Sequence, residues 1–149
     1  MGNSQFALAL HILGFLTSQR GRPLTSEQMA ATYGTSPVVL RRVLILLRQA
    51  GLVETRRGVG GGSTLARDPA EINLREVYEI VNESTEILRR YPSNVSGLAA
   101  PVMAEFVNEL YAEAERAMLE KLASVTVAEM DREIRARICD TAFSVRKAR

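Results

Sequence analysis

The sequence predicts a mainly α-helical fold, in which a winged helix-turn-helix domain with a two-stranded wing precedes a long C-terminal dimerisation helix. Two observations predict the winged helix: two short helices separated by a tight glycine turn, and a glycine-rich hairpin directly after the second of them. A third, an apolar stripe at helical spacing beyond residue 101, predicts the long helix. We expect a winged-helix domain over 1–68, a connecting helix and linker over 69–100, and dimerisation and C-terminal helices over 101–149.

The first two helices are predicted from apolar periodicity and from local start and stop signals. Residues 4–19 are apolar on most faces of a helix, which predicts a largely buried element. Thr25 and Gln28 have the spacing of a capping box, in which the hydroxyl accepts from a free backbone amide and the Gln side chain accepts from the cap backbone. They predict the start of a second helix that ends at Gly34, where glycine can adopt the left-handed conformation.

The third helix and the hairpin follow without a long connection. Ser36 with Pro37 predicts an N-cap and a first helical residue, and apolar spacing continues this helix over 37–49. Residues 52–66 predict two short strands around the glycine run 58–62. That run lacks the lysine of a phosphate-binding loop and the last glycine of a dinucleotide fingerprint. The order of elements indicates a helix-turn-helix with a recognition helix over 37–49 and a wing over 52–66.

The remainder of the chain is predicted to be helical apart from one linker. Asn73 is placed as the N-cap of a connecting helix, and residues 84–101 contain the prolines, serines and glycine of a linker. Apolar residues then predict a long helix over about 101–122. Thr126 and Glu129 form a further capping box, which predicts a C-terminal helix.

Charge is unevenly distributed along the chain. Residues 1–67 contain eight Lys/Arg and two Asp/Glu, a net charge of +6, whereas residues 68–134 contain six and fourteen, a net charge of −8. Residues 135–149 contain five and one, a net charge of +4. A basic N-terminal half beside an acidic middle indicates that one part of the molecule meets a polyanion and another does not.

The residue inventory argues against catalysis and metal binding. His11 is the one histidine and Cys139 the one cysteine, so zinc sites, Cys–His catalysis and an internal disulfide all lack partners. We therefore expect no enzyme, no metal and no cofactor, and we expect His11 to be a packed residue. Neither a signal peptide nor an apolar run of membrane-spanning length is found, so we expect a cytoplasmic protein.

The DNA-binding residues are predicted from the recognition helix, the helix before it and the wing. Arg41 can present two donors to a guanine edge or one donor to a phosphate, although arginines on a helix surface also serve solubility. Arg56 and Arg57 precede a loop with almost no side chains, which lets the backbone approach a groove. The predicted DNA-binding residues are Thr25, Ser26, Ser36, Pro37, Val38, Arg41, Arg42, Arg56, Arg57, Gly58 and Gly60.

The apolar stripe of the long helix predicts a second copy of the chain as its partner. A helix of about 22 residues is about 33 Å long, which is close to the roughly 34 Å between DNA half-sites one turn apart. The predicted dimer interface comprises Met103, Phe106, Val107, Leu110, Ala114 and Ala117. Cys139 is a redox candidate because it lies near Arg135 and Arg137, while a small residue packed with Ile138 and Phe143 is the alternative.

Several short segments together resemble the Rrf family of bacterial winged-helix regulators, which includes IscR, NsrR and CymR. These segments are residues 36–42, 51–53, 57–62, 65–69 with Ile72, 77–81 and 117–119. The resemblance implies a homodimer joined by the long helix, with two winged helices on a palindromic operator in double-stranded DNA. It also implies that the start of the recognition helix and the arginine before the wing glycines contact DNA, which assigns that role to Ser36, Val38, Arg41 and Arg57.

One departure from the family pattern matters for sensing. Cluster-binding members carry three cysteines in the linker before the long helix, and residues 84–101 contain none. An iron–sulfur cluster held in that way is therefore excluded, and within the family the sequence is most similar to YwnA-like members without the cluster cysteines. We expect a homodimeric transcription regulator that acts as a repressor, with an unknown effector.

Two alternatives remain open. The protein could be chiefly a redox or small-molecule sensor with DNA binding as its output, its pocket lying between the Asn73 helix, the linker and the long helix. It could instead be a winged-helix protein-interaction module, in which case the recognition helix and wing would not need their arginines. Arg41, Arg42, Arg56 and Arg57 favour nucleic acid.

Overall fold

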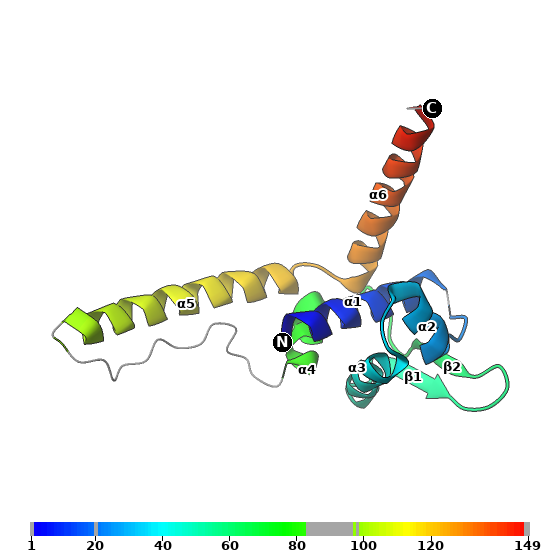
Figure 1. Cartoon of the computed structure of the whole chain (residues 1–149), viewed down its shortest axis with the longest axis horizontal. Helices are drawn as coiled ribbons and strands as arrows, with labels where there is room; N and C mark the ends of the chain where they lie inside the picture. The colour runs from blue at the N-terminus through cyan, green and yellow to red at the C-terminus, as the bar shows by residue number, and fades with distance from the viewer. Residues whose placement is uncertain (1, 20, 83–96, 98, 148–149) are drawn as a thin grey trace.

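The computed structural model describes residues 2–19, 21–82, 97 and 99–147, except for the side chains of residues 2–4 and 141–147. The described elements are α1 (Gly2–Ser18), α2 (Ser26–Tyr33), α3 (Pro37–Gln49), β1 (Val53–Arg56), β2 (Gly62–Leu65), α4 (Leu74–Val81), α5 (Ala99–Ala123) and α6 (Val127–Lys147). Figure 1 shows α1–α4 and the hairpin gathered into one body, from which α5 and α6 extend as two separate arms. The predicted winged helix-turn-helix architecture with a long following helix is confirmed.

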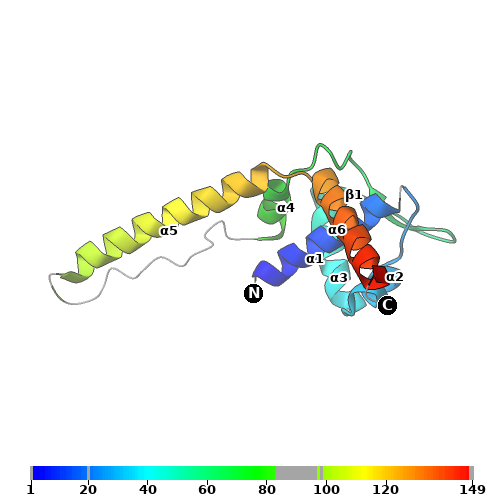
Figure 2. The same ribbon diagram turned by 90° about the horizontal axis from the view of Figure 1, so that it is seen from above.

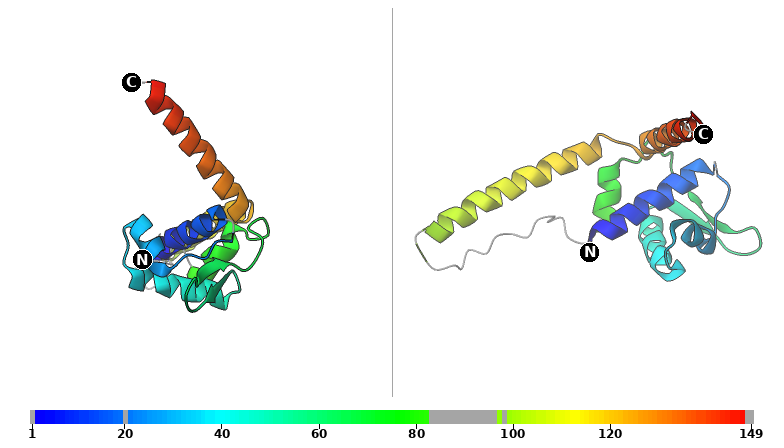
Figure 3. Two further views of the ribbon diagram at one scale, coloured as in Figure 1. Left: turned by 90° about the vertical axis from the view of Figure 1, so that its right-hand side faces the viewer. Right: turned by 45° about the horizontal axis from the view of Figure 1, so that its top comes forward.

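The core of this body is built around α1. This helix packs against α2, α3, α4 and α6, as the right-hand view of Figure 3 shows for its central position. Ile12 and Leu13 of α1 are fully buried, as are Leu40 and Leu47 of α3. Full burial of one such side chain contributes about 1.5–3 kcal/mol to folding. The prediction that the first helix is largely buried is thus confirmed, and the core of the winged helix is aliphatic.

The wing is a two-stranded antiparallel sheet in which Val53 pairs with Leu65 and Arg56 with Gly62. A third segment joins it, because Leu24 N–H donates to the Ser63 carbonyl at 3.1 Å and Ser63 N–H donates to the Leu24 carbonyl at 2.7 Å. The segment before α2 is therefore tied to the wing. Gly62, which was expected in the loop, belongs to β2 because this three-way pairing extends the strand.

The start of α4 is tied to the turn between α5 and α6. Leu74 N–H donates to the Val125 carbonyl at 2.9 Å, and Val127 N–H donates to the Ile72 carbonyl at 2.8 Å. Val127 is fully buried with the α1 and α3 core residues. The beginning of α6 is thus anchored in the winged-helix body, although most of that helix projects away from it (Figure 3, left).

The predicted caps of α2, α4 and α6 are present, as is that of α3. Thr25 and Gln28 form the expected reciprocal box at α2, with bonds of 3.2 and 2.9 Å. Asn73 accepts from the Glu76 amide at 2.9 Å at the start of α4. Thr126 N–H donates to the Glu129 carboxylate at 2.8 Å, and Glu129 N–H donates to the Thr126 hydroxyl at 3.2 Å. These local bonds explain why the three helices begin where the sequence predicts.

The long helix α5 runs over Ala99–Ala123, slightly beyond the predicted 101–122 at both ends. Its contacts with the body are with α4, and Ala104 is its one buried residue. Figure 2, seen from above, shows its free end pointing away from the body and from the wing. No helix in the described part of the chain is long and apolar enough to cross a bilayer.

Candidate nucleic-acid interface

The recognition helix α3 has one buried and one exposed side. Ser36 caps it by accepting from the Val38 amide at 3.3 Å, and Pro37 occupies its first turn. Leu40, Val43, Leu44 and Leu47 face the core. Val38, Arg41 and Arg42 are exposed as predicted, and Val38 retains 63% of its accessible surface.

A groove of about 480 Å³ runs between the start of α2, the middle of α3 and the wing. Its charged lining consists of three arginines, Arg41, Arg48 and Arg56, and one carboxylate, Glu27. Its other lining residues are apolar, hydroxyl-bearing or glycine: Leu24, Thr25, Ser26, Leu44, Ile45, Thr55, Gly58, Gly61, Gly62 and Ser63. A groove with an excess of arginine and with glycines in its wall suits the close approach of a phosphate backbone.

The groove brings together part of the predicted set. Five of the predicted residues line it, namely Thr25, Ser26, Arg41, Arg56 and Gly58. The other predicted residues lie outside the lining of the groove. At the start of α3 these are Ser36, Pro37, Val38 and Arg42, and on the wing they are Arg57 and Gly60.

Arg48 was missed by sequence reasoning. It lies seven residues after Arg41, and residues two helical turns apart share a face. That spacing was the available signal. It places a third guanidinium in the groove, beside Arg41 and Arg56.

Arg41 is held by the helix before it rather than pointing freely outward. Its Nε donates to the Ser26 hydroxyl at 3.0 Å, and its Nη2 donates to the Glu27 carboxylate. The Arg41 and Glu27 side chains keep 55% and 58% of their surface, so the pair remains open to solvent. The pKa of the Glu27 carboxyl lies below its usual value, because its own backbone amide and then Arg41 stabilise the charged form.

The wing presents its arginines with little competition from acidic groups. Arg56 lies 3.6 Å from Glu54, and both side chains are more than half exposed. A surface pair of this kind contributes only about 0–1 kcal/mol, so a phosphate can displace it at small cost. Arg42, Arg48 and Arg57 form no ion pair with any residue that the structure describes. Val59 at the wing tip is fully exposed.

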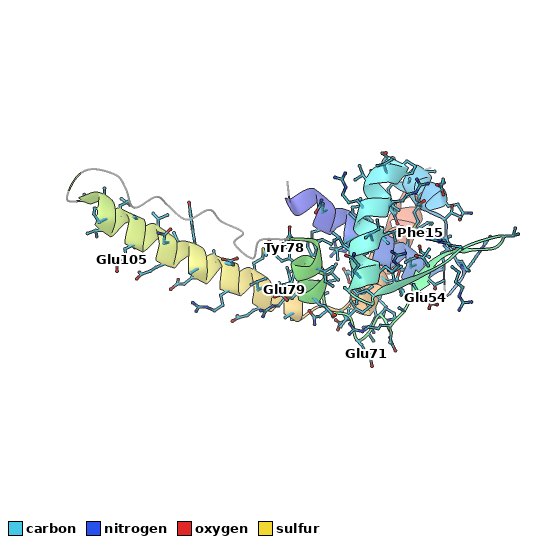
Figure 4. The ribbon with its side chains drawn as sticks, turned by 90° about the horizontal axis from the view of Figure 1, so that it is seen from below. Phe15, Glu54, Glu71, Tyr78, Glu79 and Glu105 are labelled. Atoms are coloured by element: carbon cyan, nitrogen blue, oxygen red, sulfur yellow. The ribbon has the colours of Figure 1, made fainter. Side chains whose placement is uncertain are left out.

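Some acidic residues of the middle of the chain are separated from the basic wing in space as well as along the sequence. Figure 4 shows Glu105 on α5 and Glu79 on α4 well away from the wing, on which Glu54 lies. Glu71 lies in the connection between the wing and α4. At least Glu79 and Glu105, two carboxylates of the acidic middle of the chain, therefore lie away from the arginine-lined groove.

The predicted interface residues of α5 form an uncovered apolar face. Met103, Phe106 and Leu110 keep 53%, 63% and 51% of their surface, and Val107 is half-buried. Ala114 and Ala117 are exposed. More than half of the surface of Met103, Phe106 and Leu110 is therefore open in the single chain.

Two expectations about single residues are corrected. His11 is exposed rather than packed inside, because it lies on the outer side of α1, where its ring stacks on Tyr33 at 4.8 Å. Cys139 is exposed on α6 rather than packed as a small apolar residue. Its neighbours Arg135 and Arg137 pair with Asp131 and Glu133, so their charges are partly neutralised. Within the described residues no cluster of three metal-ligating side chains occurs.

Comparison with known proteins identifies the family. The family model described as "Rrf2: Iron-dependent Transcriptional regulator" matches residues 3–133. YwnA of Bacillus subtilis is 35% identical over 125 residues, which cover 83% of this chain and 92% of YwnA. The HTH-type transcriptional regulator NsrR of the same organism is 38% identical over 87 residues, which cover 58% of this chain and 60% of NsrR.

Solved structures show the same fold. A crystal structure of a Lactobacillus plantarum protein superposes with a TM-score of 0.75 at 22% identity, covering 91% of each chain. CymR of B. subtilis superposes with a TM-score of 0.67 at 22% identity, covering 87% of this chain and 94% of CymR.

The resemblance seen in the sequence is thus confirmed over most of the chain, including the similarity to YwnA. The family consists of transcriptional regulators and not of enzymes, and the groove described above lies on its winged helix. The chain belongs to the Rrf2 family of winged helix-turn-helix, DNA-binding transcriptional regulators.

Proposed function

We propose that the protein is a homodimeric repressor that reads a palindromic operator through α3 and the wing. The observation that carries the proposal is the groove in which Arg41, Arg48 and Arg56 converge from two elements. Phosphate contacts by Lys and Arg supply most of the affinity for duplex DNA, and base-edge contacts supply its specificity. Repression is proposed because a protein bound to an operator near a promoter can block polymerase without any further contact.

The residue roles follow from position. We propose that Val38 and Arg41 meet base edges in the major groove, with Ser36, Pro37 and Arg42 beside them at the start of α3. Arg56, Arg57, Gly58 and Gly60 of the wing contact phosphates or the minor groove. Thr25 and Ser26 approach the backbone from the start of α2, where the Thr25 hydroxyl is already engaged as a cap.

The proposed division of labour places DNA reading in residues 1–68, connection in 69–100 and dimerisation in 101–149. The uncovered face of α5 supports the dimer, since Met103, Phe106 and Leu110 are large, apolar and exposed in the single chain. Pairing raises the effective concentration of the second reading head on the operator. Because bacterial DNA lies in the cytoplasm, we propose that the protein acts there.

We propose that the protein works without an iron–sulfur cluster, although its family is described as iron-dependent. Such clusters are held by several cysteine thiolates, occasionally with histidines replacing some of them. One chain contains a single cysteine and a single histidine, which do not fit this ligand set. The exposed Cys139 could form at most an intersubunit or small-thiol disulfide. The alternative effector pocket around the 84–101 linker lies mostly outside the described residues.

The test is to recover the genomic fragments that the protein retains, define the common sequence, and measure affinity for it over a range of salt. We expect a palindrome and a steep loss of affinity with salt, because several arginines in each subunit displace counterions. Arg57→Ala should weaken binding about tenfold or more, as loss of one groove contact does.

Arg75→Ala on α4 is the matched control, because Arg75 is an exposed arginine that pairs with Glu79 on its own helix. It should leave the affinity within about twofold of wild type. Recovery of no common sequence would contradict the operator proposal. Undiminished affinity in Arg57→Ala would contradict the role of the wing.

A further inference from the structure

The contacts of Arg41 leave one particular edge of its guanidinium free. A guanidinium carries five N–H donors in a plane, arranged along a side edge and an end edge. Nε and Nη2 form the side edge, and both are engaged, Nε by the Ser26 hydroxyl at 3.0 Å and Nη2 by the Glu27 carboxylate. The end edge, formed by Nη1 and the second hydrogen of Nη2, keeps two parallel donors. These match the spacing of O6 and N7 on a guanine.

We propose that Ser26 and Glu27 are positioning residues that orient Arg41 for guanine readout. This inference rests on the proposed reading role of α3. An arginine that is already held loses less side-chain freedom when it binds than one that is free to rotate. Its planar fork also demands a defined orientation, which contacts on its other edge can supply.

The platform that holds Arg41 is itself fixed. Thr25 and Gln28 cap α2 on either side of Ser26 and Glu27. The preceding residue, Leu24, is paired with Ser63 of the wing through two backbone bonds. Ser26 and Glu27 therefore sit between two anchored points, which restricts the orientations that they leave to Arg41.

Glu27 adds a penalty against the wrong sequence. Its carboxylate lines the same groove as Arg48 and Arg56, where a phosphate backbone would repel it. The stabilisation of its charged form by the α2 backbone and by Arg41 keeps it ionised at neutral pH. Specificity is the difference between the affinity for the operator and that for other DNA. The repulsion by Glu27 weakens binding to both, but only on the operator does the contact between Arg41 and its base offset it. The repulsion therefore increases the difference.

The experiment measures discrimination at a single base pair. Arg41 is assigned to a base pair of the recovered operator by comparing wild type with Arg41→Ala. At that pair, replacement of G·C by A·T lowers the affinity of wild type but not that of Arg41→Ala. The wild-type protein should prefer G·C there by about tenfold or more. Glu27→Ala should reduce that preference to about threefold or less, while its affinity for unrelated DNA stays the same or rises. Glu27→Gln, which keeps an acceptor oxygen, should retain an intermediate preference.

Glu54→Ala is the matched control, since it removes a carboxylate that neighbours an arginine on the wing. It should leave the preference at that base pair unchanged. A merely structural role of Glu27 would lower affinity for operator and unrelated DNA alike, and that result overturns the inference. Full discrimination in Glu27→Ala overturns it too, and both results leave the proposed function standing. If Arg41→Ala matches wild type at every position, the reading role of α3 is wrong as well.

Discussion

Tyr33 joins the helix-turn-helix to α1 through one side chain. Its ring stacks on His11 at 4.8 Å with an interplanar angle of 6° and meets Phe15 edge-on at 5.9 Å. Its hydroxyl donates to the His11 carbonyl at 2.9 Å. Because Tyr33 is the last residue of α2, these contacts fix the end of the helix whose beginning holds Arg41.

This position makes stability depend on pH in the alkaline range. Burial disfavours the charged phenolate and raises the pKa of Tyr33 from 10.0 to about 12. A pKa raised by folding gives stability that is complete below pH 10 and is lost as the pH rises from 10 towards 12. We expect the wild-type free energy of unfolding to fall over this window, measured by urea denaturation at successive pH values.

The free energy of unfolding of Tyr33→Phe should fall less steeply over the same window, because phenylalanine cannot ionise. It should also be less stable at neutral pH by about 1 kcal/mol, the usual contribution of one hydrogen bond. Tyr111→Phe on α5 is the control, and its pH profile should follow that of wild type. If the Tyr33→Phe and wild-type profiles are parallel, the raised pKa of Tyr33 is not what drives the alkaline loss.

At the scale of elements, the wing depends on a close backbone contact. A Cβ atom built on Gly62 would lie 2.8 Å from the backbone N, C and O of Leu24, which cannot move aside as a side-chain end can. Gly62 also has a φ of 152°, a conformation that other residues rarely adopt. The contact is close because Leu24 and Ser63 form the bridge between the wing and the segment before α2. The glycine therefore lets three segments meet.

Gly62→Ala should separate the wing from this segment and destabilise the protein. Forcing one methyl group into a packed site costs about 1–3 kcal/mol, to be measured as a shift in the denaturant midpoint. Gly60→Asn is the control, because nothing lies within 4 Å of a Cβ there and asparagine tolerates the positive φ of 75°. It should destabilise the protein by about 1 kcal/mol, the low end of the cost of a positive φ at a residue other than glycine. Equal stability of Gly62→Ala and wild type would show that the wing can shift without loss.

At the scale of the whole molecule, α5 is an arm that, among the described residues, packs mainly on α4. Figures 1 and 2 both show its free end on the opposite side of the body from the wing. Its main contact with the body is with α4, and Val102, Met103, Phe106 and Leu110 remain exposed. Exposed apolar patches of this kind mark interaction sites. A second copy of α5 covering this face would leave both wings free for DNA.

Leu110→Asp should prevent the proposed dimer from forming. Leu110 is 51% exposed in the single chain, so the substitution leaves the winged-helix core intact, whereas in a dimer it would bury an unpaired charge. Light scattering at micromolar concentration measures the mass directly, and far-ultraviolet circular dichroism checks folding. Ala112→Asp is the matched control, because Ala112 is exposed and lies on the other side of α5. A wild-type monomer at that concentration would contradict the dimer.

The sequence by itself determined where most elements begin and end. Ser36 with Pro37 predicted the start of α3, Thr25 with Gln28 that of α2, and the glycine run predicted a wing loop. These signals can be read from a sequence because capping and turn formation are local, joining groups only two to five residues apart. The exposure of Arg41 and Arg42 followed from the 3.6-residue period in the same way.

Only the tertiary structure decided what these residues face. The contacts of Arg41 with Ser26 and Glu27 span 15 and 14 positions, and the bridge from Leu24 to Ser63 spans still more of the chain. Such contacts depend on how α2 crosses α3 and where the hairpin docks, which is set by packing of the shared core and not by any local pattern. For the same reason, the sequence predicted that Arg41 lies on the surface but not which edge of its guanidinium Ser26 and Glu27 would hold. The edge that they leave free decides how Arg41 can read a base.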